Sequence, residues 1–265
     1  MISAIKRYGG KHYLAQRICR MIQPHITYVE PYFGSGAVLF RKDPNESAEV
    51  VNDLDGELMN FWTVMREHFD DFYRLICLTP FHEDVFNLAL DFESDDPVKR
   101  AWAFYIRNRM SRQGLERDFA TLTKKRQRGG MQEQVSSYLG SVEQLPEISL
   151  RLQRVLVYNR DALDIIEELD SEDTFFYCDP PYLHETRFFN ARSTYKYEMS
   201  DIQHTILLKT LAGIQGKFIL SGYPSVLYYD YAKRFGWKSL TFDVPNSASA
   251  EETKELKPET VWYNY

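Results

Sequence analysis

The segment TFFYCDPPY at residues 174–182 decides the fold and the chemistry that we expect of this chain. Its first five residues form an apolar, aromatic-rich run of the kind found in buried strands. The run ends in a carboxylate, two prolines that lack N–H groups, and a flat aromatic ring. Ligands of open α/β sheets bind at the carboxyl ends of the strands, so these last four residues are predicted to lie at a binding edge.

The groups that end this segment match a planar base with an exocyclic amine. The carboxylate of Asp179 and the carbonyl of Pro180 could each accept one N–H bond, while the ring of Tyr182 could lie against the base. We therefore take Asp179, Pro180, Pro181 and Tyr182 as candidate catalytic residues. An ordinary strand-to-loop turn is the alternative, because Asp-Pro and Pro-Pro pairs are frequent in turns. Other motifs of the chain distinguish a base-binding motif from an ordinary turn.

Strands and helices alternate at both ends of the chain, which predicts an α/β sheet. Strand-like runs lie at residues 26–29, 49–52, 155–158, 174–178, 217–221, 239–242 and 260–263. Helical spacing of apolar residues is present at residues 11–22, 54–78, 80–112 and 202–211, and residues 37–40 are expected to open another helix. We predict a core formed by residues 1–55 and 150–265, and an inserted, mainly helical region at residues 56–149 whose stretch 114–140 is irregular.

The composition is that of a globular protein with a sizeable core. The chain has 265 residues, of which 44% are hydrophobic and 15% aromatic. We find no apolar stretch long enough to span a bilayer and no secretory signal at the start, so a membrane location is not expected. Three widely spaced cysteines suggest neither a disulfide framework nor a metal site. Together these features predict a cytoplasmic protein.

A basic segment interrupts an otherwise acidic chain. Residues 107–128 contain eight Lys or Arg residues against two acidic ones, whereas the whole chain has a net charge of −6. A local basic surface of this kind favours contact with phosphates. Charged helix faces exposed to solvent are the common alternative, although here the signs are segregated rather than mixed.

A glycine loop indicates where a nucleoside would bind. Phe33, Gly34, Ser35 and Gly36 follow one predicted strand, and Asp53 ends the next strand, 19 residues after Gly34. An acid at about this distance typically binds ribose hydroxyls. The third glycine of a dinucleotide motif would fall at Leu39, so a ligand without phosphates, such as S-adenosylmethionine, fits better than a dinucleotide.

These motifs occur in the order found in a known family. The ordered set is Gly9-Gly10-Lys11, Phe33-Gly34-Ser35-Gly36, Asn52-Asp53, Asn159-Arg160-Asp161-Ala162, Asp179-Pro180-Pro181-Tyr182 and Leu220-Ser221-Gly222-Tyr223. With this set, which covers nearly the whole chain, the protein resembles the DNA adenine-N6 methyltransferases of the Dam-like D12 class, in the forms carried by phages and prophages.

The resemblance implies a Rossmann-like methyltransferase sheet with an inserted DNA-recognition region. It implies S-adenosylmethionine as methyl donor, S-adenosylhomocysteine as product, and a target adenine flipped out of double-stranded DNA. The residues that it assigns to the cofactor are Tyr8, Gly9, Lys11, Phe33, Gly34, Ser35, Gly36, Asp53, Asp161, Ala162 and Asp179. Of these, Asp53 would bind ribose, Asp161 would lie near the adenine, and Tyr8 and Lys11 near the methionine end.

The basic segment is then expected to contact DNA. Arg109, Arg112 and Gln113 are candidates for reading base edges, and Lys124, Lys125, Arg126 and Arg128 for contacting phosphates. This stretch does not align with the GATC-reading hairpin of the enteric enzymes, so the target sequence is left open. A bacterial or phage-infected cell is the expected setting, and the oligomeric state and a cognate restriction endonuclease as partner are also left open.

The chemistry implied here needs neither a metal nor a covalent intermediate. Cys178 is expected to point to the opposite side of its strand from Asp179, and therefore to be a buried strand residue rather than the nucleophile of a cytosine-C5 enzyme.

Three other functions are alternatives to the adenine-N6 reaction. An N4-cytosine enzyme would share the chemistry, but a motif beginning with Ser is more usual there. An RNA or protein-glutamine methyltransferase more usually has Asn at the first motif position. A non-catalytic DNA-binding protein with a methyltransferase shell would bind the cofactor without transferring methyl groups.

Overall fold

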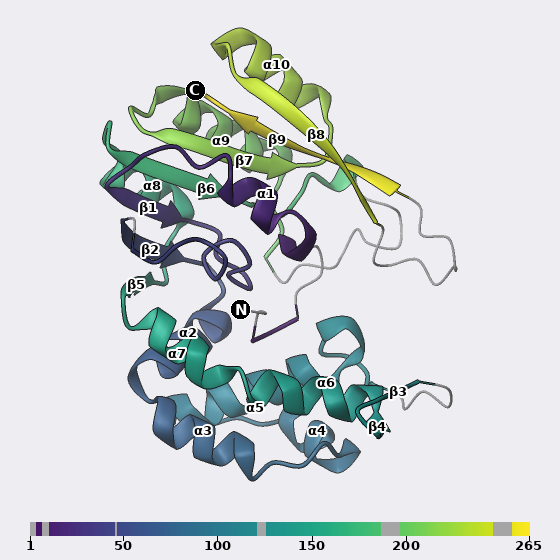
Figure 1. Cartoon of the computed structure of the whole chain (residues 1–265). Coiled ribbons are helices and arrows are strands. Elements are labelled where there is room, and N and C mark those ends of the chain that lie inside the picture. Colours follow the sequence, from purple (N-terminus) through teal and green to yellow (C-terminus); the bar gives the residue numbers. More distant parts are fainter. Residues whose placement is uncertain (1–3, 7–10, 46, 121–125, 187–196, 246–255) are drawn as a thin grey trace. The chain divides into compact units, whose positions relative to one another are not determined.

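The chain forms two compact units, which Figure 1 shows in sequence colours. The computed structural model describes residues 4–6, 11–45, 47–120, 126–186, 197–245 and 256–265. Unit 1 contains Met1–His12, Gly34–Pro44 and Asp55–Asn159, and unit 2 contains Tyr13–Phe33, Asn45–Leu54 and Arg160–Tyr265. Each unit is described separately below.

Unit 2 is built on a mainly parallel sheet. Its strands are β1 (Thr27–Glu30), β2 (Ala48–Asn52), β6 (Thr174–Cys178), β7 (Lys217–Gly222), β8 (Lys238–Pro245) and β9 (Leu256–Tyr263). They lie in the order β2-β1-β6-β7-β9-β8. The pairs β1–β2, β1–β6 and β6–β7 are parallel, whereas β9 is antiparallel to both of its neighbours. The predicted α/β class with a Rossmann-like sheet is confirmed.

The strand order creates a binding edge in unit 2. Strands β1 and β6 are adjacent, and the chain continues from β1 to β2 on one side and from β6 to β7 on the other. Such a reversal of strand order is where open α/β sheets bind ligands, outside the carboxyl ends of the strands. The segments that follow β1, β2, β6 and β7 therefore meet at one edge.

Three of the helices that are described in unit 2, namely α8, α9 and α10, begin at side chains that bind the first free N–H groups. The helices are α1 (Ala15–Cys19), α8 (Ala162–Leu169), α9 (Asp201–Gly213) and α10 (Val226–Phe235), with a short 3-10 turn η3 (His184–Thr186). Ser200 forms a capping box with Gln203 at the start of α9, and Ser225 caps α10. Large side chains from the sheet form the core of unit 2, and those of Phe175, Phe218 and Trp262 are fully buried.

Unit 1 is mainly helical. Its elements are α2 (Gly56–Glu67), α3 (Phe69–Cys77), α4 (Glu83–Leu90), α5 (Pro97–Met110), α6 (Glu133–Val142), α7 (Leu145–Leu152), the 3-10 turn η2 (Arg112–Gly114), and the strands β3 (Gln127–Arg128), β4 (Met131–Gln132) and β5 (Val155–Tyr158); a further 3-10 turn, η1 (Lys11–Tyr13), begins in this unit. Helix α5 is the centre, with α2, α3, α4 and α6 packed around it. Aromatic contacts dominate this core, and the rings of Phe61 and Tyr105 stack at 5.9 Å.

The structure differs from the predicted elements at several places. Residues 37–40 form turns rather than a helix, because Gly36 has a φ of +68° and the chain does not continue helically. The predicted helix at residues 54–78 is broken at His68, where φ is −132°. Helix α6 and the β3–β4 pair lie partly in the stretch expected to be irregular, and helices α8 and α10 were not predicted.

The unit boundaries also differ from the predicted domain bounds. Residues 1–12, 34–44 and 150–159 belong to unit 1, whereas the core had been expected to include them. Hydrogen bonds explain this grouping: the backbone N–H of Lys6 donates to Asn108 Oδ1 at 2.7 Å, and Trp62 Nε1 donates to the Gly34 carbonyl at 3.1 Å. Whether unit 1 recognises DNA stays a prediction.

Candidate active site

The motif Asp179-Pro180-Pro181-Tyr182 follows β6 at the binding edge of unit 2. Asp179 and Pro181 are partly exposed, whereas Pro180 and Tyr182 are buried. The Tyr182 hydroxyl donates a hydrogen bond to Glu259 Oε1 at 2.5 Å. The Tyr182 ring also packs edge-on against Tyr223, with 4.7 Å between centroids and 75° between the planes. The aromatic end of the motif is therefore held at both its hydroxyl and its ring.

Two phenols at this edge are kept protonated. Burial raises the pKa of Tyr182 well above its usual value, and the charges of Asp179 and Glu259 raise it further. Burial, followed by the charge of Asp179, likewise raises the pKa of Tyr177, whose hydroxyl lies 3.1 Å from Ser221 Oγ. At neutral pH Tyr182 is thus a neutral hydrogen-bond donor.

Cys178 is a buried strand residue, as predicted. Burial raises the pKa of its thiol far above the ordinary range, and the charge of Asp179 adds to this rise. The thiolate is the nucleophilic form of cysteine, so a thiol held protonated in this way is unreactive at neutral pH.

Asn52, the last residue of β2, ties two segments of the binding edge together. Its side-chain Nδ2 donates to the carbonyls of Pro31 at 3.0 Å and Arg160 at 3.1 Å, and its Oδ1 accepts from the backbone N–H of Arg160 at 2.9 Å. Asn52 is fully buried. The segments that carry Tyr32 and Asp161 are therefore fixed to the end of the strand that carries Asp53.

Two carboxylates lie within electrostatic range of Tyr32. Desolvation raises the pKa of this phenol well above its usual value, and the charges of Asp161 and Asp53 are among the further causes. Asp161 also caps helix α8, because its Oδ1 accepts the backbone N–H of Leu163 at 2.8 Å. Ala162 is buried at the first position of the same helix. The charges of both acids, which were predicted from the ribose and adenine motifs, thus act on one phenol.

The glycine loop begins where the β1 segment of unit 2 ends. Phe33 is buried in unit 2 and its N–H donates to the Asn52 carbonyl at 2.8 Å. In unit 1, Gly34 has a φ of +53°, and a Cβ added there would meet no heavy atom within 4 Å. The backbone beside Gly34 is therefore open to close approach by a ligand. Ser35 and Gly36 are buried.

Lys11 is buried in η1, and Tyr8 and Gly9 lie outside the described residues. The donor set of unit 2 fits a nucleoside with a cationic tail: Asp53 and Asp161 supply carboxylates that are at least partly exposed, and the partly exposed Tyr32 supplies an aromatic ring. In the described part of the chain, no group of three His, Cys, Asp or Glu residues is arranged to hold a metal ion.

The predicted DNA-reading residues of unit 1 have different environments. Arg112 and Gln113 are exposed in η2, where Gln113 has a left-handed φ of +57°. Gly114 follows with a φ of +74°, and a Cβ there would lie 2.7 Å from Lys6 Cβ, so the turn is tightly enclosed on that side. Arg109 is only 8% exposed, and its guanidinium donates to the Ser137 carbonyl at 2.7 Å. Arg109 therefore packs within unit 1 and is not at its surface.

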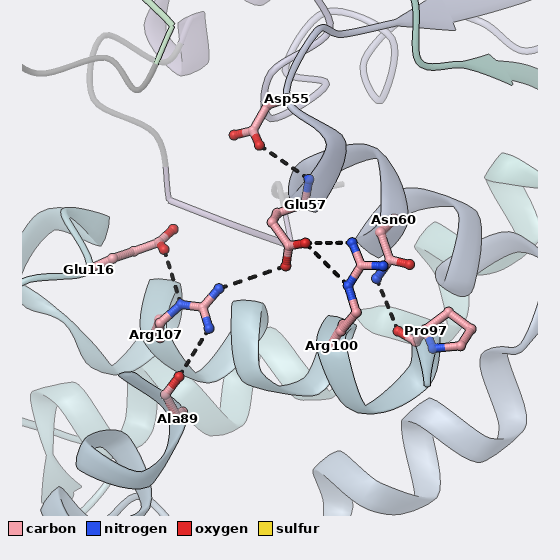
Figure 2. A network of polar contacts seen from close by, with 8 residues as sticks. All are labelled: Asp55, Glu57, Asn60, Ala89, Pro97, Arg100, Arg107 and Glu116. Atoms are coloured by element: carbon pink, nitrogen blue, oxygen red, sulfur yellow. Dashed lines mark hydrogen bonds and ion pairs between the residues drawn. The ribbon is translucent and has the colours of Figure 1, made fainter. Parts of the chain in front are cut away.

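An ion network anchors the same part of unit 1 (Figure 2). Glu57 accepts from Arg100 at 2.5 Å and lies 4.0 Å from Arg107. Arg107 also donates to Glu116 at 3.4 Å and to the Ala89 carbonyl at 3.0 Å. Arg107 is one of the eight basic residues of the segment 107–128, but its guanidinium binds acidic and carbonyl partners within unit 1.

Two of the remaining basic candidates, Arg126 and Arg128, lie at the β3–β4 pair of unit 1. Arg126 and Arg128 are exposed, and Arg126 lies 3.8 Å from Glu133. Gly129 and Gly130, both with positive φ, form the two-residue turn between the strands. Lys124 and Lys125 lie outside the described residues. Arg112, Arg126 and Arg128 are therefore the exposed cations among the predicted DNA contacts that the structure describes.

Sequence reasoning missed two residues of this site, Asn52 as a clamp and Glu259 as the partner of Tyr182. Asn52 belonged to the recognised Asn52-Asp53 pair but was given no role there, and its place at the end of a strand was a usable signal. Glu259 gave no such signal, because it lies 77 residues from Tyr182 in the sequence.

The fold and the site define an α/β protein of the Rossmann-like class, with acidic and aromatic groups at its binding edge. Comparison with protein families sharpens this class. The family model of the D12 class N6 adenine-specific DNA methyltransferases matches residues 8–241, and the chain belongs to this family. Methyl transfer from S-adenosylmethionine is implied by the family.

Individual relatives point to the same family. The chain is 28% identical over 248 residues to the DNA N-6-adenine-methyltransferase of Escherichia phage P1, covering 86% of this chain and 31% of that protein. It is 24% identical over 244 residues to the DNA adenine methylase of Serratia marcescens, covering 86% of this chain and 85% of that one. The chain thus spans about a third of the phage P1 relative and most of the Serratia relative.

A solved structure of a putative RNA methyltransferase from Pyrococcus horikoshii superposes with a TM-score of 0.42 and 9% identity, over 98% of this chain and 86% of that one. A TM-score of this size is too low to add to the fold described above. Among the helices of the described residues, none is both long and apolar enough to cross a membrane.

Proposed function

We propose that this chain methylates N6 of adenine in double-stranded DNA, with S-adenosylmethionine as donor. The observation that carries the proposal is the position of Asp179-Pro180-Pro181-Tyr182 directly after β6, beside the point where the strand order of unit 2 reverses. The acids Asp53 and Asp161, near Tyr32, supply the second half of such a site.

The cofactor would be held mainly by the segments that follow β1 and β2. Asp53 would accept the ribose hydroxyls, while Asp161 and Ala162 would lie near the adenine and Phe33 would supply apolar surface. The loop Gly34-Ser35-Gly36 follows Phe33 directly, and its first residue, Gly34, offers open backbone. Tyr8, Gly9 and Lys11 are proposed at the methionine end. When bound, S-adenosylmethionine supplies an electrophilic methyl group on a sulfonium.

The target amine would be activated by acceptors. An aromatic amine is a weak nucleophile because its lone pair is delocalised into the ring. The carboxylate of Asp179 and the carbonyl of Pro180 would accept both N–H bonds, which favours the tetrahedral nitrogen and frees the lone pair. Pro181 restricts the backbone of this segment. Holding the amine in line with the methyl group would supply much of the remaining acceleration.

The adenine must leave the duplex to reach these groups. Tyr182 is proposed to stack against the flipped base, which would replace part of the lost stacking, by roughly 1–3 kcal/mol. On unit 1, the exposed side chains Arg112, Gln113, Arg126 and Arg128 are proposed to contact the DNA, together with Lys124 and Lys125. Acting on DNA would place the protein with the chromosome in the cytoplasm of a bacterial or phage-infected cell.

The proposal is tested by nucleoside mass spectrometry on unmethylated genomic DNA after incubation with the purified protein and S-adenosylmethionine. We expect N6-methyladenine from the wild type and none above background from Asp179→Ala. Appearance of N4-methylcytosine would keep the mechanism and change the base. Cofactor binding without any DNA methylation would favour an RNA or protein substrate, or a non-catalytic shell, and would overturn the proposal.

A further inference from the structure

We propose that Glu259 is a positioning residue for Tyr182: its carboxylate accepts the Tyr182 hydroxyl and sets the plane of the ring against which the target base stacks. This inference rests on the function proposed above, because it assigns a role to a residue that would act through the base-stacking tyrosine.

The contact between these two residues is enclosed. Tyr182 is 5% exposed and Glu259 is 7% exposed, and 2.5 Å separates Tyr182 Oη from Glu259 Oε1. A hydrogen bond to an ionised acceptor is stronger than one between neutral groups, and exclusion of water strengthens it further. The phenol is a neutral donor because burial and the neighbouring carboxylates hold its proton.

The antiparallel strand explains how Glu259 reaches the catalytic edge. Strands β6 and β7 end at this edge, whereas β9 runs in the opposite direction beside β7. In the register of this pair, Gly222 at the end of β7 lies opposite Thr260, the residue after Glu259. The side chain of Glu259, in the first half of β9, therefore lies at the edge where the parallel strands end.

The strand that carries Glu259 is itself held firmly. Glu259 pairs with Phe242 in the β8–β9 ladder, and the hydroxyls of Thr241 and Thr260 lie 2.9 Å apart in the neighbouring pair. Glu259 therefore presents its carboxylate from backbone that is paired with β8, one residue before Thr260, where the pairing of β9 with β7 begins. A site held on strands is more precise than one held on a loop.

Two contacts together define the orientation of the Tyr182 ring. The hydroxyl is held by Glu259, and the ring packs against that of Tyr223 in a T-shaped arrangement, with 4.7 Å between centroids. Without the carboxylate, the hydroxyl end of the ring would lose this acceptor, and the plane of the ring would be less strictly defined. The reacting amine has to be aligned with the methyl group, and the ring orients the base that carries this amine. A less well oriented ring would therefore lower the rate of transfer more than the affinity for the cofactor.

The test compares three variants under single-turnover conditions, with N6-methyladenine as product. Tyr182→Phe removes the donor, Glu259→Ala removes the acceptor, and Glu259→Gln keeps an acceptor oxygen without the charge. We expect Tyr182→Phe and Glu259→Ala each to slow transfer roughly 10- to 100-fold, the range of a hydrogen bond to a charged group. Glu259→Gln should recover most of the rate, and all three should bind S-adenosylmethionine within about twofold of the wild type.

A matched control comes from the same sheet. Tyr28 in β1 is fully buried, and its hydroxyl donates to the buried Glu30 at 2.8 Å. Tyr28→Phe removes an equivalent phenol–carboxylate bond on the neighbouring strand β1, outside the motif, so it should lower the midpoint of urea denaturation while leaving the single-turnover rate unchanged. A rate loss in Tyr182→Phe that Tyr28→Phe does not share then separates positioning from general destabilisation.

The outcomes distinguish this inference from the function on which it rests. An active wild type with Tyr182→Phe and Glu259→Ala transferring methyl groups at the wild-type rate overturns the role of Glu259 and leaves the proposed function intact. Equal rates for Glu259→Gln and Glu259→Ala overturn it as well. If Glu259→Ala does not fold, the near-isosteric Tyr182→Phe and Glu259→Gln decide. A wild type that forms no N6-methyladenine overturns both.

Discussion

Replacement of Asn52 by alanine is expected to loosen the cofactor-binding edge of unit 2 and to destabilise it. The Asn52 side chain makes three hydrogen bonds, to the Pro31 carbonyl and to both backbone groups of Arg160. At about 1 kcal/mol each, their loss lowers the free energy of unfolding by roughly 3 kcal/mol. The position is fully buried, so the alanine variant leaves these backbone groups without the partner they now have.

The same change should weaken S-adenosylmethionine binding. Asn52 joins the segments that carry Tyr32 and Asp161. Without it, part of the binding free energy of the cofactor would be lost in ordering these segments. We expect the dissociation constant, measured by isothermal titration calorimetry, to rise by about tenfold, which corresponds to 1.4 kcal/mol of that ordering. Urea denaturation followed by circular dichroism measures the accompanying loss of stability.

Asn264 offers the control. Its side chain accepts from the Phe218 N–H at 3.0 Å and donates to the Gly216 carbonyl at 2.9 Å, at the beginning of β7 and thus at the opposite edge of the sheet. Asn264→Ala should lower stability, by less because the residue is exposed, and should leave cofactor affinity unchanged. If Asn52→Ala binds S-adenosylmethionine as tightly as the wild type does, or if Asn264→Ala weakens binding equally, the clamp role assigned to Asn52 is refuted.

Four further changes test other parts of the molecule. Asp179→Ala should lower single-turnover methylation by roughly 100-fold or more while S-adenosylmethionine affinity stays within a few fold, and equal losses of both would argue against an acceptor role. Tyr182→Ala should reduce turnover more than cofactor binding, and unchanged activity would rule out base stacking. Arg112→Ala should reduce the slope of log affinity for DNA against log salt by about 1, whereas an unchanged slope in gel-shift titrations would place Arg112 away from phosphates. Burial, aided by the charge of Arg109, lowers the pKa of Lys6 to about 8, below that of the unfolded chain. Between about pH 8 and 10 the unfolded state therefore binds more protons, and stability rises with pH. Relative to Lys6→Met, the free energy of unfolding of the wild type should rise by about 1 kcal/mol from pH 7.5 to 9.5, after allowance for partial exposure. The same difference in urea midpoint between the two proteins at both pH values would contradict this.

Local patterns in the sequence determined the class of fold and the motif that anchors the chemistry. The buried strand at residues 174–178 and its terminal Asp179 could be predicted because a short aromatic run followed by prolines allows few local structures. The burial of Cys178 followed from its place in a short apolar strand, all five residues of which are buried. By contrast, the expected helix at residues 37–40 was wrong, since its apolar residues fit a helix while Gly36 turns the chain with a positive φ.

Contacts between distant residues were decided by the tertiary structure alone. Arg109 looked like a surface cation, but α5 is the centre of unit 1 and turns this guanidinium toward Ser137. Glu259 is brought to Tyr182 by the antiparallel strand β9, which lies between β7 and β8. This strand order cannot be predicted from the local sequence pattern. Periodicity reports which face of an element is buried, whereas strand order and register decide which of the buried groups meet. The sequence by itself therefore determined the chemistry at the end of β6, and only the folded sheet decided which residues hold it in place.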